Sequence, residues 1–238
     1  MSAVFDGTNG ITLPSWNTAG RPAVPSTGQT GYNSTLNAVE TYNGTAWVTS
    51  GLHLVGYAEV PIGSATTNGI DVSNCFTAKY RNYRIVFHIY GNSAPSTAVS
   101  CNIALETAGS GLTGVNFTAP TFPTGYNWAM RFQSLIASAS NGVQQGSGTN
   151  YAELLGTVDT SNTGWSFVGE TTVFDAYAST PKIGHTQGVM INPTPYIEDS
   201  GFQTTGNVAA RGVRIYVGTT AGSSTPSVYG NVRVYGLA

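Results

Sequence analysis

Short runs of alternating apolar and polar residues recur along the chain, and such runs are typical of β-strands. The clearest covers residues 83–90, where Ile85, Phe87 and Ile89 share one face. A period of two is expected for a strand with one buried face, because successive side chains point to opposite sides of a sheet. No stretch has apolar residues at positions i, i+3, i+4 and i+7 over three turns, so the pattern predicts no α-helix.

Similar runs follow one another at short intervals from Leu52 to the end of the chain, separated by turns rich in Gly, Ser and Pro. Many short strands with such turns favour a two-sheet sandwich of jelly-roll type or a closed barrel, and we expect the sandwich. The run at 98–106 is expected to pair with 83–90, and the polar segment SNGVQQGSGTN is expected to connect two strands. The predicted strands are 52–62, 70–76, 83–90, 98–106, 128–139, 151–158, 165–177, 182–191, 213–217 and 232–234.

Residues 29–51 predict a small antiparallel β-meander. Residues 38–42 alternate, with Val39 on one face and Glu40 on the other, and residues 46–48 continue after Asn43-Gly44. Asn-Gly between two alternating runs indicates a hairpin with a type I′ turn, because both residues tolerate the positive φ that this turn requires.

Residues 1–28 predict an extended arm and a linker. The first sixteen residues contain too few large apolar side chains to form a core of their own. Residues 17–28 contain two prolines and two glycines, which is typical of a linker. We therefore expect the arm to be disordered or to be ordered against a partner, and its candidate attachment residues are Phe5, Ile11, Leu13 and Trp16.

The pattern as a whole predicts an all-β protein in three parts: an extended arm and linker at 1–28, a small β-meander at 29–51, and a jelly-roll-like β-sandwich at 52–238. The length of 238 residues is sufficient for a sizeable core. Only 8% of the residues are charged, about a third of the usual share, so hydroxyl and amide groups must hydrate the surface.

The charge distribution excludes several classes of partner. Nine basic and eleven acidic residues are scattered and give a net charge of −2, without a basic stripe for nucleic acid or for an anionic membrane. The first residues lack the basic and apolar regions of a signal peptide. No window approaches the about 18 apolar residues of a membrane-spanning helix. Cys75 and Cys101 are interpreted as buried thiols, with a disulfide as the alternative.

Four segments carry a resemblance to a known group of proteins. FDGTNGITLPSW (5–16) and RPAVPSTGQTGYNSTLNAVETYNGTAWV (21–48) resemble N-terminal segments of structural proteins of tailed bacteriophages. YRNYRIVF (80–87) and GNVRVYGL (230–237) resemble the jelly-roll domains of the same proteins. The resemblance implies a structural role in the virion, commonly as a homotrimer, with the arm attached to the particle.

We therefore expect a non-enzymatic virion surface protein, namely a trimeric short tail fibre or adhesin that presents its sandwich to the host. It would be made in the host cytoplasm and located on the particle surface. Its partners would be other copies of itself, other virion proteins through the arm, and a host cell-surface glycan or protein. The alternatives are a capsid decoration or cement protein (or head fibre) and, more remotely, a glycan-cleaving enzyme.

The motifs indicate neither a catalytic site nor a cofactor or metal site. His53, His88 and His185 have no second ligand at the spacing that zinc sites use. No serine lies in a G-x-S-x-G elbow. Residues 109–114 match G-x-G-x-x-G, but the segment that follows cannot be the helix that a dinucleotide site requires, so we interpret them as a loop.

The acidic residues were considered for catalysis and for calcium. Adjacent residues Glu198 and Asp199 on a strand would point to opposite faces, unlike the convergent pair of a glycosidase. The remaining candidates are interpreted as solvated side chains: Glu153, Asp159, Glu170 and Asp175. Calcium bound by Asp71, Asp159 or Asp175 is an alternative that no acidic loop motif supports.

Aromatic residues beside Gly- and Pro-rich segments are the better functional signal. Flat apolar rings next to Asn, Thr and Gln provide the surfaces on which sugar rings stack and form hydrogen bonds. Packing at the ends of the sandwich or at a subunit contact is the alternative. The candidate host-glycan contacts are Tyr126, Trp128, Trp165, Tyr196 and Phe202.

Overall fold

The chain forms two compact units, Met1–His53 and Leu54–Leu237, each with its own sheets. The computed structural model describes residues 4–6, 10–36, 38–49, 52–62, 68–91, 98–106, 126–134, 142–149, 151–158, 164–192, 194–207, 209–218 and 226–237. Strands and the turns between them account for nearly all of these residues, which confirms the all-β prediction.

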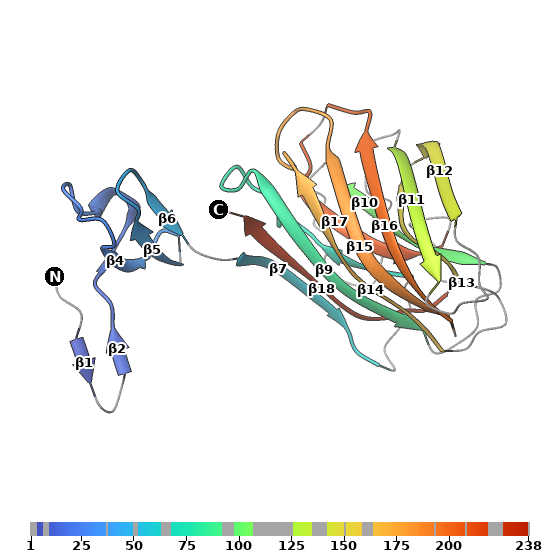
Figure 1. Ribbon diagram of the computed structural model, residues 1–238, viewed down its shortest axis with the longest axis horizontal. Helices are drawn as coiled ribbons and strands as arrows, with labels where there is room; N and C mark the ends of the chain where they lie inside the picture. Colours follow the sequence, from blue (N-terminus) through green and yellow to red (C-terminus); the bar gives the residue numbers. More distant parts are fainter. Residues whose placement is uncertain are drawn as a thin grey trace. The chain divides into compact units, whose positions relative to one another are not determined.

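The described strands are short and follow one another closely, as the alternating pattern predicts (Figure 1). A single 3₁₀ turn, η1 (Thr18–Gly20), is the helical element within these ranges, and none of their helices has the length and hydrophobicity to cross a membrane. The strands are β1 (Val4–Asp6), β2 (Gly10–Thr12), β3 (Ser15–Trp16), β4 (Thr30–Asn33), β5 (Ala38–Tyr42), β6 (Trp47–Thr49), β7 (Leu52–Val60), β8 (Gly69–Val72), β9 (Asn82–Gly91), β10 (Val99–Glu106), β11 (Tyr126–Ser134), β12 (Gly142–Thr149), β13 (Ala152–Val158), β14 (Trp165–Phe174), β15 (Ile183–Asn192), β16 (Thr194–Thr204), β17 (Gly212–Val217) and β18 (Tyr229–Leu237).

The first unit contains the predicted meander and one strand more. β4, β5 and β6 pair antiparallel in sequence order, and β3 joins β4 in parallel at the edge of the sheet. The preceding β1 and β2 form a separate antiparallel pair. Residues 15 and 16, expected in a free arm, are therefore bonded into the meander sheet.

The turn between β5 and β6 differs from the prediction. Tyr42 pairs with Trp47, so the loop has four residues and not the two of a type I′ turn. Among the loop residues only Gly44 has a positive φ. The Asn43 carboxamide oxygen accepts hydrogen bonds from the backbone N–H groups of Thr45 and Ala46, both at 2.9 Å. This local bonding stabilises a longer turn than the Asn-Gly dipeptide alone predicts.

The second unit consists of two antiparallel sheets packed as separate layers (Figure 1). One sheet has the order β12-β11-β16-β15-β14-β9-β18-β7, and the other has the order β13-β10-β17-β8. β13 of the smaller sheet lies against β11 and β16 of the larger one. The two sheets therefore enclose one shared interior.

The pairing of these strands is nested. β11 pairs with β12, β10 with β13, β9 with β14, and β8 with β17, so that partners lie progressively further apart in the sequence. The hairpin of β15 and β16 is inserted between β14 and β11, and β18 pairs with the outer side of β9. The first half of the unit is thus folded back onto the second half as one long hairpin.

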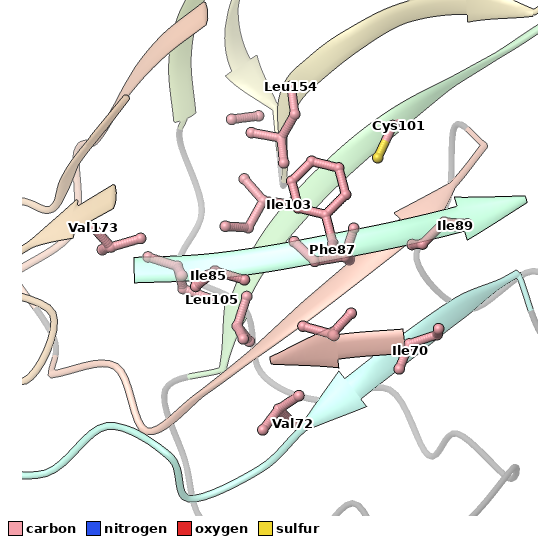
Figure 2. Packing of buried hydrophobic residues seen from close by; sticks show 14 of the residues in the cluster. Ile70, Val72, Ile85, Phe87, Ile89, Cys101, Ile103, Leu105, Leu154 and Val173 are labelled. Atoms are coloured by element: carbon pink, nitrogen blue, oxygen red, sulfur yellow. The ribbon is translucent and has the colours of Figure 1, made fainter. Parts of the chain in front are cut away.

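The interior is filled by the inward faces of both sheets. The predicted face of β9 is buried, and Figure 2 shows Phe87 beside Ile103 of β10 and Leu154 of β13. From β18, Val232 and Val234 belong to the same cluster. Burial of these side chains provides the main favourable contribution to folding, in proportion to the apolar area removed from water.

Three details of the strand prediction were wrong. β10 pairs with β13 and β17 in the smaller sheet, not with β9. The polar segment 142–149, expected as a connection, forms strand β12 at the edge of the larger sheet. Residues 194–204, which were not assigned, form β16. An edge strand and a strand rich in polar residues have weak apolar alternation, and backbone pairing with a neighbour determines their structure.

The interpretation of the cysteines as buried thiols is confirmed. Cys75 and Cys101 are both free and both buried, Cys75 three residues after the end of β8 and Cys101 within β10. Burial raises the pKa of the Cys75 thiol to about 12 and that of Cys101 well above its usual value. Both sulfurs therefore pack as small apolar groups.

We predict that Phe87→Ala destabilises the second unit by about 3–5 kcal/mol, because it leaves a cavity at the centre of the shared interior. The measurement is the midpoint of urea denaturation of this unit. The matched control is His88→Ala, at the exposed neighbouring position on β9, with an expected change within about 0.5 kcal/mol. Equal effects of the two variants would contradict this account of the core.

Candidate functional site

Three of the five aromatic residues expected at a glycan surface are part of the core. Tyr126, Trp165 and Phe202 are nearly completely buried, so the expectation that they contact a ligand was wrong. The Tyr126 hydroxyl accepts a hydrogen bond of 2.9 Å from the backbone N–H of Leu105. These residues lie within strands and not in loops, and the alternation of side chains directs them into the sandwich.

Trp128 and Tyr196 differ from the other three because both retain some exposure. Both are partly buried and pack against the edge of the core. Trp128 also lines a hollow on the larger sheet, whereas Tyr196 does not. Phe202 lines the hollow too, but the rings of Trp128 and Phe202 both pack toward the core, on the side of the sheet opposite Asn127 and Ala129, so neither offers an exposed aromatic face in the hollow.

The hollow lies across strands β12, β11 and β16 and has a volume of about 560 Å³. Ala129 and Gly201 are cross-strand partners at its centre, and Gln145 lies opposite Ala129 on the other side. Asn127 and Gln203 form the next cross-strand pair. The lining residues are Asn127, Trp128, Ala129, Gln145, Gly146, Gly201, Phe202 and Gln203. None of them carries a charge.

Side chains along these strands alternate between the two faces of the larger sheet, and the hollow lies on the face that points away from the core. Asn127, Ala129, Gln145 and Gln203 are exposed, whereas Tyr126 and Met130 of the same sheet are buried. The hollow is deepest at its centre because Ala129 has a small side chain and Gly201 has none. The carboxamides of Asn127, Gln145 and Gln203 surround this centre. Carboxamides donate and accept hydrogen bonds without charge, so the hollow is suited to binding and has no acid, base or nucleophile for catalysis.

A hydrogen-bonded histidine–aspartate pair borders this hollow. The His185 Nε2 and an Asp199 carboxylate oxygen are 2.8 Å apart, and His185 is the cross-strand partner of Gly201. The sequence alone does not pair these two residues, because their proximity depends on the register of β15 and β16. Both side chains are about half exposed, so the pair contributes little to stability.

The expected attachment residues of the arm do not form one exposed set. Trp16 is 6% exposed, and its indole N–H donates to Glu40 at 2.5 Å, so it belongs to the core of the first unit. This corrects the prediction that Trp16 is available to a partner. Leu13 is half-buried, and the side chains of Phe5 and Ile11 lie outside the described part of the structure.

Glu40 is the polar centre of the first unit. Its carboxylate is completely buried and accepts hydrogen bonds from Trp16, from Asn33 at 3.0 Å, and from Arg21 Nε and Nη2 at 2.9 and 2.6 Å. Val39, expected on the apolar face, is 40% exposed. The sheet therefore buries the acidic residue of β5 and exposes the aliphatic one, because four donors compensate for the loss of hydration.

The pKa of Glu40 reflects two opposing effects. Burial alone would raise it, but hydrogen bonds from Arg21, Trp16 and Asn33 and the charge of Arg21 outweigh burial and hold it below its usual value. Arg21 lies in the segment interpreted as a linker. The ion pair therefore binds residues 17–28 to the meander, and so does the bond from the Gly28 N–H to the Tyr42 carbonyl at 2.7 Å.

Among the acidic candidates for catalysis, Glu153 and Glu198 lie near each other inside the sandwich, and the charge of Glu153 helps to raise the pKa of Glu198. Burial raises the pKa of Glu153 itself to about 7, so the expectation that this side chain is solvated was wrong.

The other acidic candidates for catalysis are dispersed. Glu170 pairs with Arg84 and Asp175 pairs with Arg81, while Asp159 lies outside the described residues. Glu198 is buried, whereas its neighbour Asp199 is exposed, as alternation predicts. Glu198 accepts a hydrogen bond of 2.5 Å from the Gly156 N–H. These described carboxylates form no exposed convergent pair.

The described calcium candidates, Asp71 and Asp175, each lie beside an arginine. Asp71 lies 3.8 Å from the Arg214 guanidinium, and burial raises its pKa to about 7 despite this neighbour. Arg214 also donates to the Asn68 carboxamide at 3.0 Å. Within the described ranges, no group of three or more His, Cys, Asp or Glu side chains is arranged to hold a metal ion.

Comparisons with protein-family models and with curated proteins found no match to this chain.

We predict that Glu40→Gln lowers the stability of the first unit by about 1–3 kcal/mol, because the amide cannot pair with the Arg21 charge. In the wild type this contribution is present above the usual pKa of Glu, near 4.5, and is lost as the pH falls through the lower pKa of the folded state. Hydrogen exchange of the β4 and β5 amides between pH 3 and 7 measures it. The control is Glu59→Gln, at an exposed position of β7; an equal pH response in Glu40→Gln and wild type would contradict the prediction.

We predict the opposite pH response for the Glu198 site. Burial raises the pKa of Glu198 to about 7, so its stabilising contribution is present below about 4.5 and is lost as the pH rises through 7. Glu198→Gln should keep the bond from Gly156 and reduce the loss of stability between pH 5 and pH 8 by about 1–3 kcal/mol. Urea denaturation at the two pH values measures this, with Glu59→Gln, at an exposed position of β7, as the control. An unchanged pH dependence in Glu198→Gln would refute the assignment.

Proposed function

We propose that the protein is a non-enzymatic virion surface protein of a tailed bacteriophage, a trimeric short tail fibre or adhesin. Its N-terminal unit attaches it to the particle, and its second unit faces the host. The observation that carries the proposal is the division of the chain into a small N-terminal unit and a larger sandwich. This division, together with the resemblance of residues 5–16 and 21–48 to phage virion proteins, supports separate attachment and presentation functions.

The strand order supports a jelly roll as the specific fold of the second unit. In a jelly roll a long hairpin is folded into two sheets, so that strands pair in a nested order. The four nested pairs β8–β17, β9–β14, β10–β13 and β11–β12 fit this description, with β15 and β16 as an inserted hairpin. Viral coat proteins and lectins are among the proteins that use this fold.

The surface composition supports a role in assembly. Only 8% of the residues are charged, so identical subunits can approach each other with a small cost of desolvating charged groups. The first unit exposes Val24, Val39 and Val48. Apolar side chains on a small attachment unit suit contacts with other virion proteins or with sister subunits.

We predict that deletion of residues 2–51 prevents incorporation into particles and leaves a folded sandwich. The deletion removes the whole first unit apart from the start of β7, whose pairing with the second unit stays intact. The measurements are the amount of protein on purified particles by imaging, and circular dichroism of the truncated protein. Incorporation at the wild-type level would contradict the proposal.

Particles that lack the protein separate this function from capsid decoration. A fibre or adhesin predicts loss of adsorption to the host, whereas a decoration protein predicts loss of shell stability under heat or osmotic shock. Normal adsorption together with a weakened shell would replace the proposed function by the decoration role.

A further inference from the structure

The outward face of strands β12, β11 and β16 contains a hollow that the packing of the sandwich does not require. Among the residues that the structure describes, a Cβ at Gly201 would come within 4 Å of the Gly184 carbonyl oxygen alone, at 3.6 Å, which is an ordinary van der Waals distance. Its φ is not in the left-handed region. Gly201 is thus free of the steric and backbone constraints that usually explain a glycine within a strand.

Neighbouring glycines of the same sheet are different. A Cβ at Gly184 would overlap the ring of Phe202, and one at Gly188 would come within 2.8 Å of Leu155 and of the Val168 carbonyl oxygen. Packing therefore explains these two glycines but not Gly201. Gly201 leaves open space next to Ala129, at the centre of a hollow of about 560 Å³.

The side chains around this space define the chemistry of a ligand. Asn127, Gln145 and Gln203 each offer a carboxamide, which both donates and accepts hydrogen bonds. Sugar hydroxyl groups also do both, so each carboxamide can pair with a hydroxyl in either direction. No lining residue carries a charge that would compensate for the desolvation of an ionic ligand.

The shape of the hollow favours an oligosaccharide over a peptide. It crosses three strands, a width of about 10 Å, on the face of the sheet and not along one edge. An extended peptide usually binds by adding a strand to an edge, where unpaired backbone groups are available. In the middle of β11 those backbone groups already pair with β12 and β16.

The immediate neighbours of the hollow agree with a neutral ligand. Ile183, the partner of Gln203, is 54% exposed and offers an aliphatic surface beside the carboxamides. The Asp199 carboxylate lies between His185 and the exposed Arg131, its cross-strand partner on β11, and the opposite charges of Arg131 and Asp199 offset each other at this border. A sugar ring has an apolar face and polar edges, and it matches such a mixed surface.

We propose that the hollow on β12, β11 and β16 binds a neutral oligosaccharide through Asn127, Gln145 and Gln203, with Gly201 and Ala129 as its floor. This deepens the proposed adhesin function, on which it rests, by naming the site and the class of ligand. It requires neither a metal ion nor any of the buried carboxylates.

The test uses the purified full chain and saturation-transfer NMR. The probes are maltohexaose, cellohexaose, chitohexaose and mannohexaose, with hexagalacturonate as the charged probe. We expect saturable binding of at least one neutral hexasaccharide and at least tenfold weaker binding of hexagalacturonate. Gly201→Val fills the floor, and we expect it to weaken binding at least tenfold. Ala129→Leu fills the same floor from β11 and serves as the second variant if Gly201→Val does not fold.

A second comparison removes the same kind of side chain, a glutamine carboxamide, inside and outside the hollow on the same face of the sheet. Gln203→Leu removes a carboxamide from the hollow and should weaken binding, whereas Gln187→Leu removes an exposed carboxamide of β15 outside it and should leave binding unchanged. Four results would overturn the site: no binding of any neutral probe, equal binding by wild type and the floor-filling variants, equal loss in both glutamine variants, or stronger binding of hexagalacturonate.

This experiment requires no phage particle, so its failure is distinguishable from failure of the proposed function. Loss of the site with normal particle incorporation would leave a virion protein whose host contact lies elsewhere. Binding that depends on Gly201, in a protein that does not associate with particles, would leave a glycan-binding protein with another role.

Discussion

The shared interior between the two antiparallel sheets is the constraint on which the second unit depends. Every inward position of β9, β10, β17 and β18 must fill the same space, so the register of one sheet limits the register of the other. A shift by one residue in β9 would move Ile85, Phe87 and Ile89 to the outward face. The nested pairing fixes these registers across strands that are distant in sequence.

Polar groups are buried in both units, but they are compensated in different ways. Glu40 receives four hydrogen bonds, two from a cation, and it stays ionised in a small sheet that has few apolar side chains. Glu198 has one backbone donor, and the cost of burying its charge favours the protonated form. Stronger desolvation and the nearby charge of Glu153 raise the pKa of Glu198, whereas the donors around Glu40 outweigh its desolvation.

The sequence was informative wherever one face of a strand is apolar and the other polar. The buried face of β9 and the thiols of Cys75 and Cys101 were predicted correctly for this reason. The sequence was uninformative where contacts with residues elsewhere in the chain determine whether a segment forms a strand or a side chain is buried. β12 has almost no apolar residues, and the burial of Glu40 depends on Arg21, nineteen residues away. Tyr126 and Phe202 were assigned to a surface because no predicted strand included them. Trp165 began a predicted strand, and its burial depends on which face of that strand turns toward the core. The hollow at Gly201 depends on the register of three strands, which one sequence does not specify.

The two cysteines have a consequence for where the fold can persist. Thiol–disulfide exchange requires an accessible thiolate, and both sulfurs are enclosed and held in the protonated form. The chain therefore needs no oxidant to complete its fold, and an oxidising medium offers no reaction at these positions. The two cysteines therefore keep one covalent state in reducing and in oxidising surroundings.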